Sequence, residues 1–260
     1  MQPLQPGIPT SDKKLVRQLL RKAAAQSAVG QRLKIITARL LGFPYLVNPL
    51  IGSPHEPEQF VASLSGFDCV TFMETVLALA LADSVDDYPE LLREIRYVYG
   101  EVEWKRRHHY TVDWARHNIW RGFLSDVTKG EEVVNRRKTL DLVPGLPPRI
   151  VSFSYFPKRK LQHVSKRLQD GDLIFFVSTR KGLDVFHVGL LFINRDQVLL
   201  RHATRSCGAV VEQELKEFIA ANRMSGFIVV RPREKNGGEK RKRENLRYHR
   251  TAETNEDQSE

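Results

Sequence analysis

The chain has 260 residues, of which 41% are hydrophobic and 9% aromatic, which is enough to bury the core of one domain. It contains no run of about eighteen apolar residues, so we expect no membrane span. The first seven residues lack the basic and apolar regions of a secretory signal. We therefore expect the protein in the cytoplasm, or in the periplasm or cell envelope if an export segment has been omitted.

The formal net charge of +10 is not confined to one end of the chain. Residues 235–250 contribute +5 and the last ten residues −4, so residues 1–234 keep a charge of +9. Such an excess suits an anionic polymer, namely nucleic acid, anionic lipid or peptidoglycan. No RNA-binding signature or zinc-finger spacing occurs, which disfavours nucleic acid as the partner.

Two cysteines are present, Cys69 and Cys207. A disulfide framework is not expected in a chain of this size, and no cysteine pair has the spacing of a zinc site. We interpret Cys207 as an ordinary free thiol, and we expect neither a metal nor another cofactor.

The N-terminal part is predicted to be helical. Prolines make residues 1–10 an extended leader, and Ser11 is expected to cap a first helix that has leucine and valine on one face. A second helix over 31–41 is expected to end at Gly42. Four prolines between residues 43 and 58 predict an ordered loop instead of a helix or a strand. A long loop in this position is often functional.

A helix that begins near Cys69 is the centre of the prediction. Gly66 and Asp68 lie where the chain has to turn and cap, and apolar residues then recur at helical spacing as far as Ala80. A cysteine in the first turn faces unpaired N–H groups and the positive end of the helix dipole, which lower the thiol pKa below ~8.5. The alternative is that Cys69 is a small core residue. For Asp68 we prefer the role of helix cap alone.

The rest of the sequence predicts an α+β fold. A helix is expected over 89–99, and a segment rich in polar aromatic residues follows over 104–120. Short β-branched runs then predict strands, with one helix over 211–221 among them. The strands are expected over 150–156, 172–178, 185–193, 197–203 and 227–231. Helices followed by a meander of strands favour α+β over a doubly wound sheet.

One domain is expected over residues 11–233. Residues 234–260 hold a glycine pair, a basic run over 240–243 and a polar acidic end, with almost no apolar residue. This composition predicts a disordered charged tail. A nucleic-acid-binding or localisation signal is the alternative interpretation of the basic run.

Two histidines stand in predicted strands among apolar residues. His187 lies in the strand over 185–193, and His202 lies in the next one. A buried imidazole is costly without a hydrogen bond, and a single one is usually a satisfied core residue. If the strands pair as a meander, the two histidines lie side by side. Cysteine at a helix start, histidine on one strand and a polar residue on the next is the order of a papain-like site.

This order resembles the NlpC-type cysteine hydrolases, a papain-like superfamily that acts on cell walls. Within it, the segment FDCVTFMET over 67–75 is similar to the signature of the N-acetylmuramoyl-L-alanine amidase-like family. Further stretches with this resemblance are LGFPY (41–45), NPLIG (48–52), RHHY (107–110), DW (113–114) and RHA (201–203). The resemblance implies a papain-like fold, with a helical N-terminal half packed on a small, mostly antiparallel, barrel-like sheet.

The resemblance also implies roles for three residues. Cys69 would be the nucleophile, His187 the general base and then the general acid, and His202 the residue that orients His187. A neutral imidazole suits this task because it can take the thiol proton and later give it to the leaving amine. The oxyanion hole would use the backbone N–H of Cys69 and the hydroxyl of Tyr45.

Residues for substrate binding are expected near the same site. A muropeptide has sugar faces that an aromatic ring can cover and carboxylates that an arginine can bind. The alternatives are a salt-bridged surface helix with its tryptophan turned inward, and a purely turn-shaping role for the loop residues. The candidates are Tyr45, Asn48, Arg107, His109, Tyr110, Asp113 and Trp114.

We predict a monomeric cysteine hydrolase that cleaves an amide in peptidoglycan or muropeptides. The favoured bond joins the lactyl group of N-acetylmuramic acid to L-alanine. One alternative is a D-glutamyl-diamino acid endopeptidase of the stem peptide, because the triad does not determine the subsites. The other is a non-catalytic binding module for an anionic polymer. A metallo-amidase is disfavoured because no histidine pair stands at ligand spacing with a carboxylate.

Overall fold

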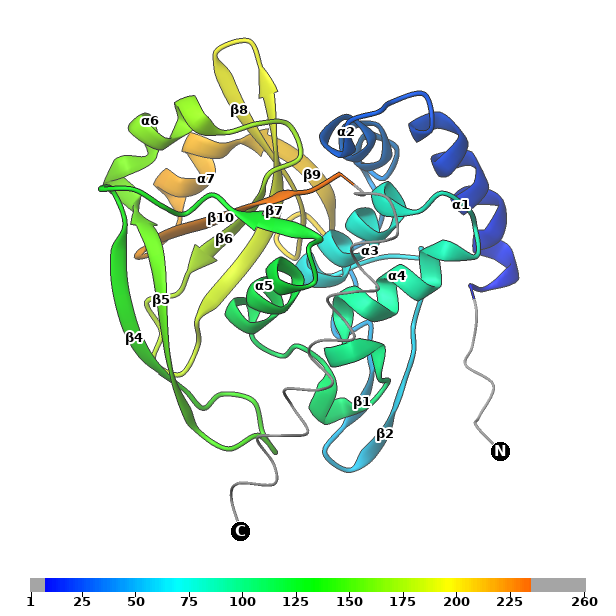
Figure 1. Ribbon diagram of the computed structural model, residues 1–260, viewed down its shortest axis with the longest axis horizontal. Helices are drawn as coiled ribbons and strands as arrows, with labels where there is room; N and C mark the ends of the chain where they lie inside the picture. The colour runs from blue at the N-terminus through cyan, green and yellow to red at the C-terminus, as the bar shows by residue number, and fades with distance from the viewer. Residues whose placement is uncertain (1–7, 235–260) are drawn as a thin grey trace.

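The computed structural model describes residues 8–234, with helices in the first half of the chain and a large sheet in the second (Figure 1). The first half contains α1 (Thr10–Ala23), α2 (Val29–Arg39), β1 (Ile51–Ser53), β2 (Glu56–Gln59), α3 (Cys69–Leu81), α4 (Asp87–Arg96), η1 (Val98–Gly100), η2 (Trp104–Arg106) and α5 (Thr111–Trp120). The second half contains β3 (Leu124–Asp126), β4 (Val134–Leu140), β5 (Arg149–Pro157), η3 (Lys158–Lys160), α6 (Leu161–Val164), η4 (Ser165–Arg167), β6 (Leu173–Val177), β7 (Val185–Asn194), β8 (Gln197–Thr204), β9 (Ala209–Glu214), α7 (Leu215–Ala221) and β10 (Gly226–Pro232).

Eight strands form one sheet in which every pairing is antiparallel. The strand order is β4-β5-β10-β6-β7-β8-β9, and β3 pairs with β10 beside this path. Within residues 8–234 the terminal strands β4 and β9 do not pair, so the sheet stays open. The expected mixed α+β fold with a mostly antiparallel sheet is confirmed, but the sheet does not close into a barrel.

The reason for the open sheet lies in β4 and β5. These strands pair with each other over seven residue pairs, whereas β5 pairs with β10 only at Pro157 and Phe156. The β4–β5 hairpin therefore extends away from the sheet, as Figure 1 shows. The outer strand carries Arg136, Arg137 and Lys138 in succession, and charged side chains on an edge strand discourage further pairing.

Alternation along the central strands buries both faces of the sheet, as the period of two predicts. On one face Phe175 and Val188 pack against the helical half. On the other, Ile174 and Leu191 belong to a smaller core that α7 covers through Phe218. Each central strand is therefore apolar along almost its whole length, and a polar residue placed there needs a partner.

Helix α3 lies between the sheet and the other helices, and all its residues from Thr71 to Leu81 are buried. Its one charged residue, Glu74, lies 2.7 Å from Nε of Arg96 on α4, and both side chains are only 2% exposed. Arg96 also donates to the carbonyl oxygen of Val61 at 2.6 Å. Since neither charge can reach water, the pair fixes α3 against α4.

The ends of the first two helices differ from the prediction. Helix α1 begins at Thr10 with Pro9 as its N-cap, so Ser11 lies inside the helix and does not cap it. Helix α2 ends at Arg39, and Gly42 follows three residues later with a φ of 83°. The N–H of this glycine donates to Val210 of β9, so it marks the start of a pairing with the sheet instead of a helix cap.

Two segments predicted without a strand contain one. The proline-rich loop over 43–58 includes most of the β1–β2 hairpin, with Pro54 between the two strands. The helix expected over 211–221 starts only at Leu215, because the preceding residues form β9 and pair with β8. Val210 and Val211 are β-branched, and an available partner strand decides the structure of such a segment.

Among the helices of residues 8–234, none is long and apolar enough to cross a membrane. The predicted leader is described only from residue 8 onward. The predicted charged tail lies outside the described residues except for Glu234, and the single-domain boundary at residues 11–233 stays a prediction.

The buried ion pair of α3 gives a test of this packing. Arg96→Met should lower the free energy of unfolding by about 3–5 kcal/mol, because it leaves the carboxylate of Glu74 buried and unpaired. Arg106→Met is the matched control, since Arg106 and Glu101 pair at 2.8 Å with side chains 39% and 51% exposed. Its loss should stay below about 1 kcal/mol in urea unfolding. Equal losses for both variants would contradict the role given to Arg96.

Candidate active site

The start of α3 is held by a capping box. The N–H of Thr71 donates to Oδ1 of Asp68 at 2.7 Å, and the N–H of Asp68 donates to Oγ1 of Thr71 at 3.0 Å. Asp68 therefore caps the helix as predicted, and Cys69 is the first residue of α3. The reciprocal bonds fix the direction in which the chain enters the helix, and thus the place of the Cys69 side chain.

The loop that carries Tyr45 is paired with the residue before the cap. The N–H of Phe67 donates to Pro44 at 3.0 Å, and the N–H of Leu46 donates to Phe67 at 2.9 Å. Gly66 permits this contact, because a Cβ there would lie 2.7 Å from the carbonyl oxygen of Pro44. Pro44 and Leu46, on either side of Tyr45, are thus hydrogen-bonded to Phe67, two residues before Cys69.

Helix α3 contacts the sheet where β7 and β8 separate. The β7–β8 pairing runs from Asn194 to Leu190 and includes none of residues 185–189. Here the backbone N–H of Val188 is one of the groups that act to lower the pKa of the Cys69 thiol. Gly189 keeps the opening narrow, since a Cβ on it would lie 2.6 Å from the Leu200 side chain. Cys69 therefore lies against the residue that follows His187.

His187 and His202 meet across the same opening. Nε2 of His187 is 2.5 Å from Nδ1 of His202, and Nε2 of His202 is 2.7 Å from the side-chain nitrogen of Gln213 on β9. The ring of Phe218 stacks on His187 with centroids 5.4 Å apart and meets His202 edge-on at 5.3 Å. The side chains bridge the two strands at the point where their backbones no longer pair.

Burial keeps all three groups uncharged. It raises the pKa of the Cys69 thiol to about 12, with a further increase from the neighbouring Asp68 carboxylate. It lowers the pKa of His187 to about 3, with the help of His202, and that of His202 to about 4. At neutral pH the thiol of Cys69 and both imidazoles are therefore uncharged at rest.

The lowered thiol pKa expected for Cys69 is wrong in direction. Three backbone N–H groups, of Cys69 itself, Val70 and Val188, do act to lower it. Loss of hydration and the negative charge of Asp68 outweigh them, because both disfavour a thiolate. Asp68, which caps the helix, thus raises the thiol pKa that the N–H groups at the helix start lower.

Tyr45 and Asn48 lie in the loop before α3 but in different surroundings. Burial and the proximity of Cys69 and Asp68 raise the pKa of Tyr45, so its hydroxyl stays a hydrogen-bond donor at neutral pH. Tyr45 thus interacts electrostatically with Cys69. Asn48 is exposed and has a φ of 52°, a left-handed conformation that asparagine tolerates in turns.

The polar groups of Arg107 and His109 are engaged within the chain. Nη1 of Arg107 lies 2.9 and 3.0 Å from the two carboxylate oxygens of Glu58 on β2, which also accepts from the Tyr97 hydroxyl at 2.8 Å. Nε2 of His109 lies 2.7 Å from the carbonyl oxygen of Trp104, whose ring packs on the imidazole. These contacts attach the segment before α5 to the β1–β2 hairpin.

Tyr110, Asp113 and Trp114 are also occupied by structural contacts. The Tyr110 hydroxyl accepts from the N–H groups of Leu142 and Val143 at 2.9 and 3.2 Å. Asp113 forms an ion pair with Arg149. Trp114 is 1% exposed and packs in the core. This arrangement is the salt-bridged helix with an inward tryptophan that the sequence left open.

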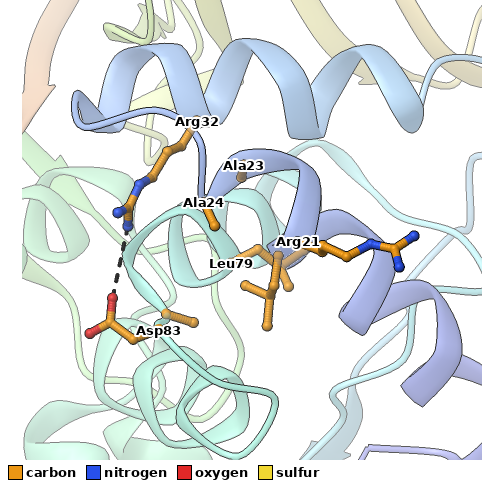
Figure 2. A pocket seen from close by; sticks show the side chains of 8 residues that line it. Arg21, Ala23, Ala24, Arg32, Leu79 and Asp83 are labelled. Atoms are coloured by element: carbon orange, nitrogen blue, oxygen red, sulfur yellow. Dashed lines mark ion pairs between the residues drawn. The ribbon is translucent and has the colours of Figure 1, made fainter.

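A cavity of about 60 Å³ adjoins the start of α3, where Leu46, Gly66 and Thr71 are among its lining residues, and three larger cavities lie farther from Cys69. One of about 190 Å³ is bounded by α1, α2 and the far end of α3, where Arg32 and Asp83 form an ion pair at 3.9 Å (Figure 2). Others, of about 410 and 440 Å³, adjoin α7 and the start of α2. Cys69, His187 and His202 line none of these three. Within residues 8–234 no group of three potential ligands is arranged for a metal.

Gln213 and Phe218 contact the histidine pair but were not predicted. Both lie in the stretch that the sequence pattern assigned to one continuous helix. Gln213 could have been identified as a neighbour of His202 if β9 had been predicted as a strand beside β8. In that pairing Gln213 lies opposite Leu200. Alternation of side chains along β9 then places Gln213 two positions from Val211, which pairs with His202.

Comparison with known proteins identifies a family for this chain and similar solved structures. A model of the AmiA-like family, described as N-acetylmuramoyl-L-alanine amidase-like, matches residues 35–227. An N-acetylmuramoyl-L-alanine amidase from Bacteroides uniformis is similar, with a TM-score of 0.71 and 27% identity over 79% of this chain and 99% of that one. Protein LPG0564 from Legionella pneumophila has the same fold, with a TM-score of 0.75 and 22% identity over 85% and 94%. No curated protein sequence matches the chain.

The thiol pKa can be tested by alkylation. In the Cys207→Ser variant, the rate at which iodoacetamide modifies Cys69 should rise about tenfold per pH unit from about pH 6 to 9, because the pKa of about 12 leaves little thiolate. Mass spectrometry of quenched samples measures this rate. A plateau below about pH 8 would show that the thiolate is stabilised and that the sequence-based expectation was right.

Proposed function

The chain belongs to the N-acetylmuramoyl-L-alanine amidase-like family, and from this premise we propose that it is a cysteine hydrolase of peptidoglycan or its fragments. The bond cleaved is the amide between the lactyl group of N-acetylmuramic acid and L-alanine. The observation that carries the proposal is the hydrogen-bonded pair His187 and His202, 2.5 Å apart, next in sequence to Val188, whose backbone N–H acts on the pKa of the Cys69 thiol. A thiol, a base and a group that orients the base are the parts of a nucleophilic acyl transfer.

The first step is acylation of Cys69. The thiol gives its proton to His187 as the sulfur bonds to the lactyl carbonyl carbon, so no free thiolate has to form beforehand. The negative oxygen of the tetrahedral intermediate accepts hydrogen bonds from the backbone N–H of Cys69 and the Tyr45 hydroxyl. His187 then protonates the nitrogen of L-alanine, the C–N bond breaks, and the stem peptide leaves with a free amine.

The second step releases the sugar. A water molecule gives a proton to His187 and attacks the thioester carbonyl, and the C–S bond breaks as the sulfur regains a proton. The products are the muramic acid carboxylate and the free enzyme. The net reaction consumes one water for each amide, and His187 acts in turn as base and acid in both halves.

We also assign the chain to the NlpC-type, papain-like superfamily. The support is the order of its parts: a cysteine at a helix start, a histidine on a later strand and a second polar residue on the following antiparallel strand. Papain-like sites recur by role and geometry instead of by sequence position.

The substrate is an anionic wall polymer or a fragment of it, which suits the net charge of +10. Such a substrate places the working protein in the periplasm or cell envelope if an export segment precedes the chain, and otherwise in the cytoplasm, acting on soluble fragments. We propose that it acts as a monomer. Arg107 and Asp113 reach substrate only by exchanging their present partners, so direct contact with the wall is expected first from Tyr45 and Asn48.

The bond and the nucleophile are tested together on purified muropeptides. Wild type should release free stem peptide and bare sugar, and Cys69→Ala should reduce the rate on the order of 10⁴-fold or more, because it removes the nucleophile. Cys207→Ala, which removes the exposed second thiol, is the control and should cleave normally. Mass spectrometry of the products measures both.

Other products would redirect the proposal. A sugar that keeps a dipeptide would move the bond to the D-glutamyl-diamino acid position with the same mechanism. Equal activity of wild type and Cys69→Ala would overturn cysteine catalysis. No cleavage by a folded wild type would favour the non-catalytic binding module.

The role of Tyr45 has its own prediction. Tyr45→Phe should lower kcat by about 10²–10³-fold at unchanged KM, because it removes a donor used only by the oxyanion. Tyr155→Phe on β5, where the ring packs beside Arg136, is the control and should leave kcat unchanged. A drop in KM alone, or no change in kcat, would count against Tyr45 as an oxyanion donor.

A further inference from the structure

Gln213 is the last member of a hydrogen-bond chain that ends at the base. It is half-buried on β9, opposite Leu200 of β8, and its side-chain nitrogen lies 2.7 Å from Nε2 of His202. The other ring nitrogen of His202 lies 2.5 Å from Nε2 of His187. The order from the edge strand inward is therefore amide, imidazole, imidazole.

A chain of this kind can run in only two directions while both rings are neutral, because a neutral imidazole has one N–H donor and one acceptor. In one direction the amide N–H donates to His202, and Nδ1–H of His202 donates to His187. The proton of His187 then sits on its own Nδ1. In the other direction the amide oxygen accepts from Nε2–H of His202, and Nε2–H of His187 donates to His202.

Only the second direction leaves His187 competent as a base. Since Nε2 of His187 faces His202, Nδ1 is the one ring nitrogen left to take the thiol proton. In the first direction Nδ1 already carries a proton and cannot accept another. In the structure the amide nitrogen of Gln213 faces His202, which corresponds to the first direction. Rotating the amide by 180° places its oxygen there and reverses every hydrogen bond of the series.

We propose that Gln213 is a positioning residue whose side-chain amide sets the direction of the His202–His187 hydrogen bond, and so decides whether His187 can accept a proton. In the working enzyme the amide presents its oxygen to His202. This role rests on the proposed function of His187 as the base.

The other groups around the two histidines do not fix the direction of their hydrogen bond, so the Gln213 amide can set it. Phe218 packs against both rings, and burial keeps both uncharged. The carboxylates on either side of Gln213 in the sequence are already paired, Glu212 with Arg201 at 2.5 Å and Glu214 with Lys216 at 2.7 Å. An uncharged amide that can rotate thus takes the place where many histidine dyads have a fixed acceptor.

Two substitutions separate this role from simple packing. Gln213→Glu presents only acceptor atoms and holds the competent direction, whereas Gln213→Met has a similar shape and no strong hydrogen-bonding group. At pH 8, where both rings are neutral, the Glu variant should keep kcat within about threefold of wild type. The Met variant should lose about 10- to 100-fold in kcat at unchanged KM, because the chain loses its terminal acceptor. Gln197→Met at the exposed start of β8 is the control and should match wild type.

The tautomers are read directly from ¹H–¹⁵N spectra of the histidine rings, without substrate. Wild type and Gln213→Glu should show His187 with its proton on Nε2, and Gln213→Met should populate the Nδ1–H form. If Gln213→Met does not fold, Gln213→Asn replaces it, since it keeps the amide but withdraws it by one methylene group, and the same shift is expected.

The opposite result would overturn the proposal. Full activity with Met and loss with Glu would show that Gln213 only fills space, and so would His187 tautomers that are the same in all variants. Because the spectra need no turnover, a failure of the amidase proposal would leave the tautomer result intact. Unchanged tautomers together with normal muropeptide cleavage would reject the role of Gln213 alone.

Discussion

The ion pair between Glu74 and Arg96 is the constraint on which the site depends. Helix α3 is buried on every side, so its one charge can be satisfied only by a partner that reaches it inside the core. A buried pair of this kind contributes little net stability compared with apolar residues, but it admits few alternative arrangements. Arg96 also binds Val61, in the segment that leads to the Asp68 cap. The position of Cys69 therefore follows from an interaction a full helical turn away.

The arrangement of the candidate site also depends on an interruption in the sheet, where the pairing of β7 with β8 ends. If β7 and β8 paired along their whole length, no polar group of β7 would be available at this point to the helix. Pairing stops at Leu190, and the stretch beyond it holds Val188, whose backbone N–H acts to lower the pKa of the Cys69 thiol, and His187, which contacts His202. Residues just beyond the end of a strand pair are held in place by the rigid sheet, and their backbone groups remain available to partners outside the sheet.

The cap at Asp68 and the positions of the candidate catalytic residues in the fold were easier to predict than the structure around them. The cap at Asp68 and the order of Cys69, His187 and His202 follow from local patterns, namely helix capping and a meander of apolar strands. β9 could not be recognised, because its six residues have strand character only through pairing with β8. The partners of Arg107 and Tyr110 come from Glu58 and the segment after β4, which are distant in sequence. The same non-local burial reversed the expected shift in the Cys69 pKa.

The uncharged resting state of Cys69, His187 and His202 has a consequence for how the reactivity of the thiol is controlled. Burial raises the pKa of the Cys69 thiol, so in the proposed mechanism the thiol stays protonated until a carbonyl carbon is in place to take the developing charge. A protonated sulfur reacts slowly with oxidants and alkylating agents, which act on the thiolate. In the proposed mechanism, the imidazolium of His187 needs an acceptor at His202, and the ring of His202 needs an acceptor in turn. If the proposed mechanism holds, selectivity for substrate over small electrophiles depends on the same burial that keeps both imidazoles neutral and thereby makes the direction of their hydrogen bonds matter.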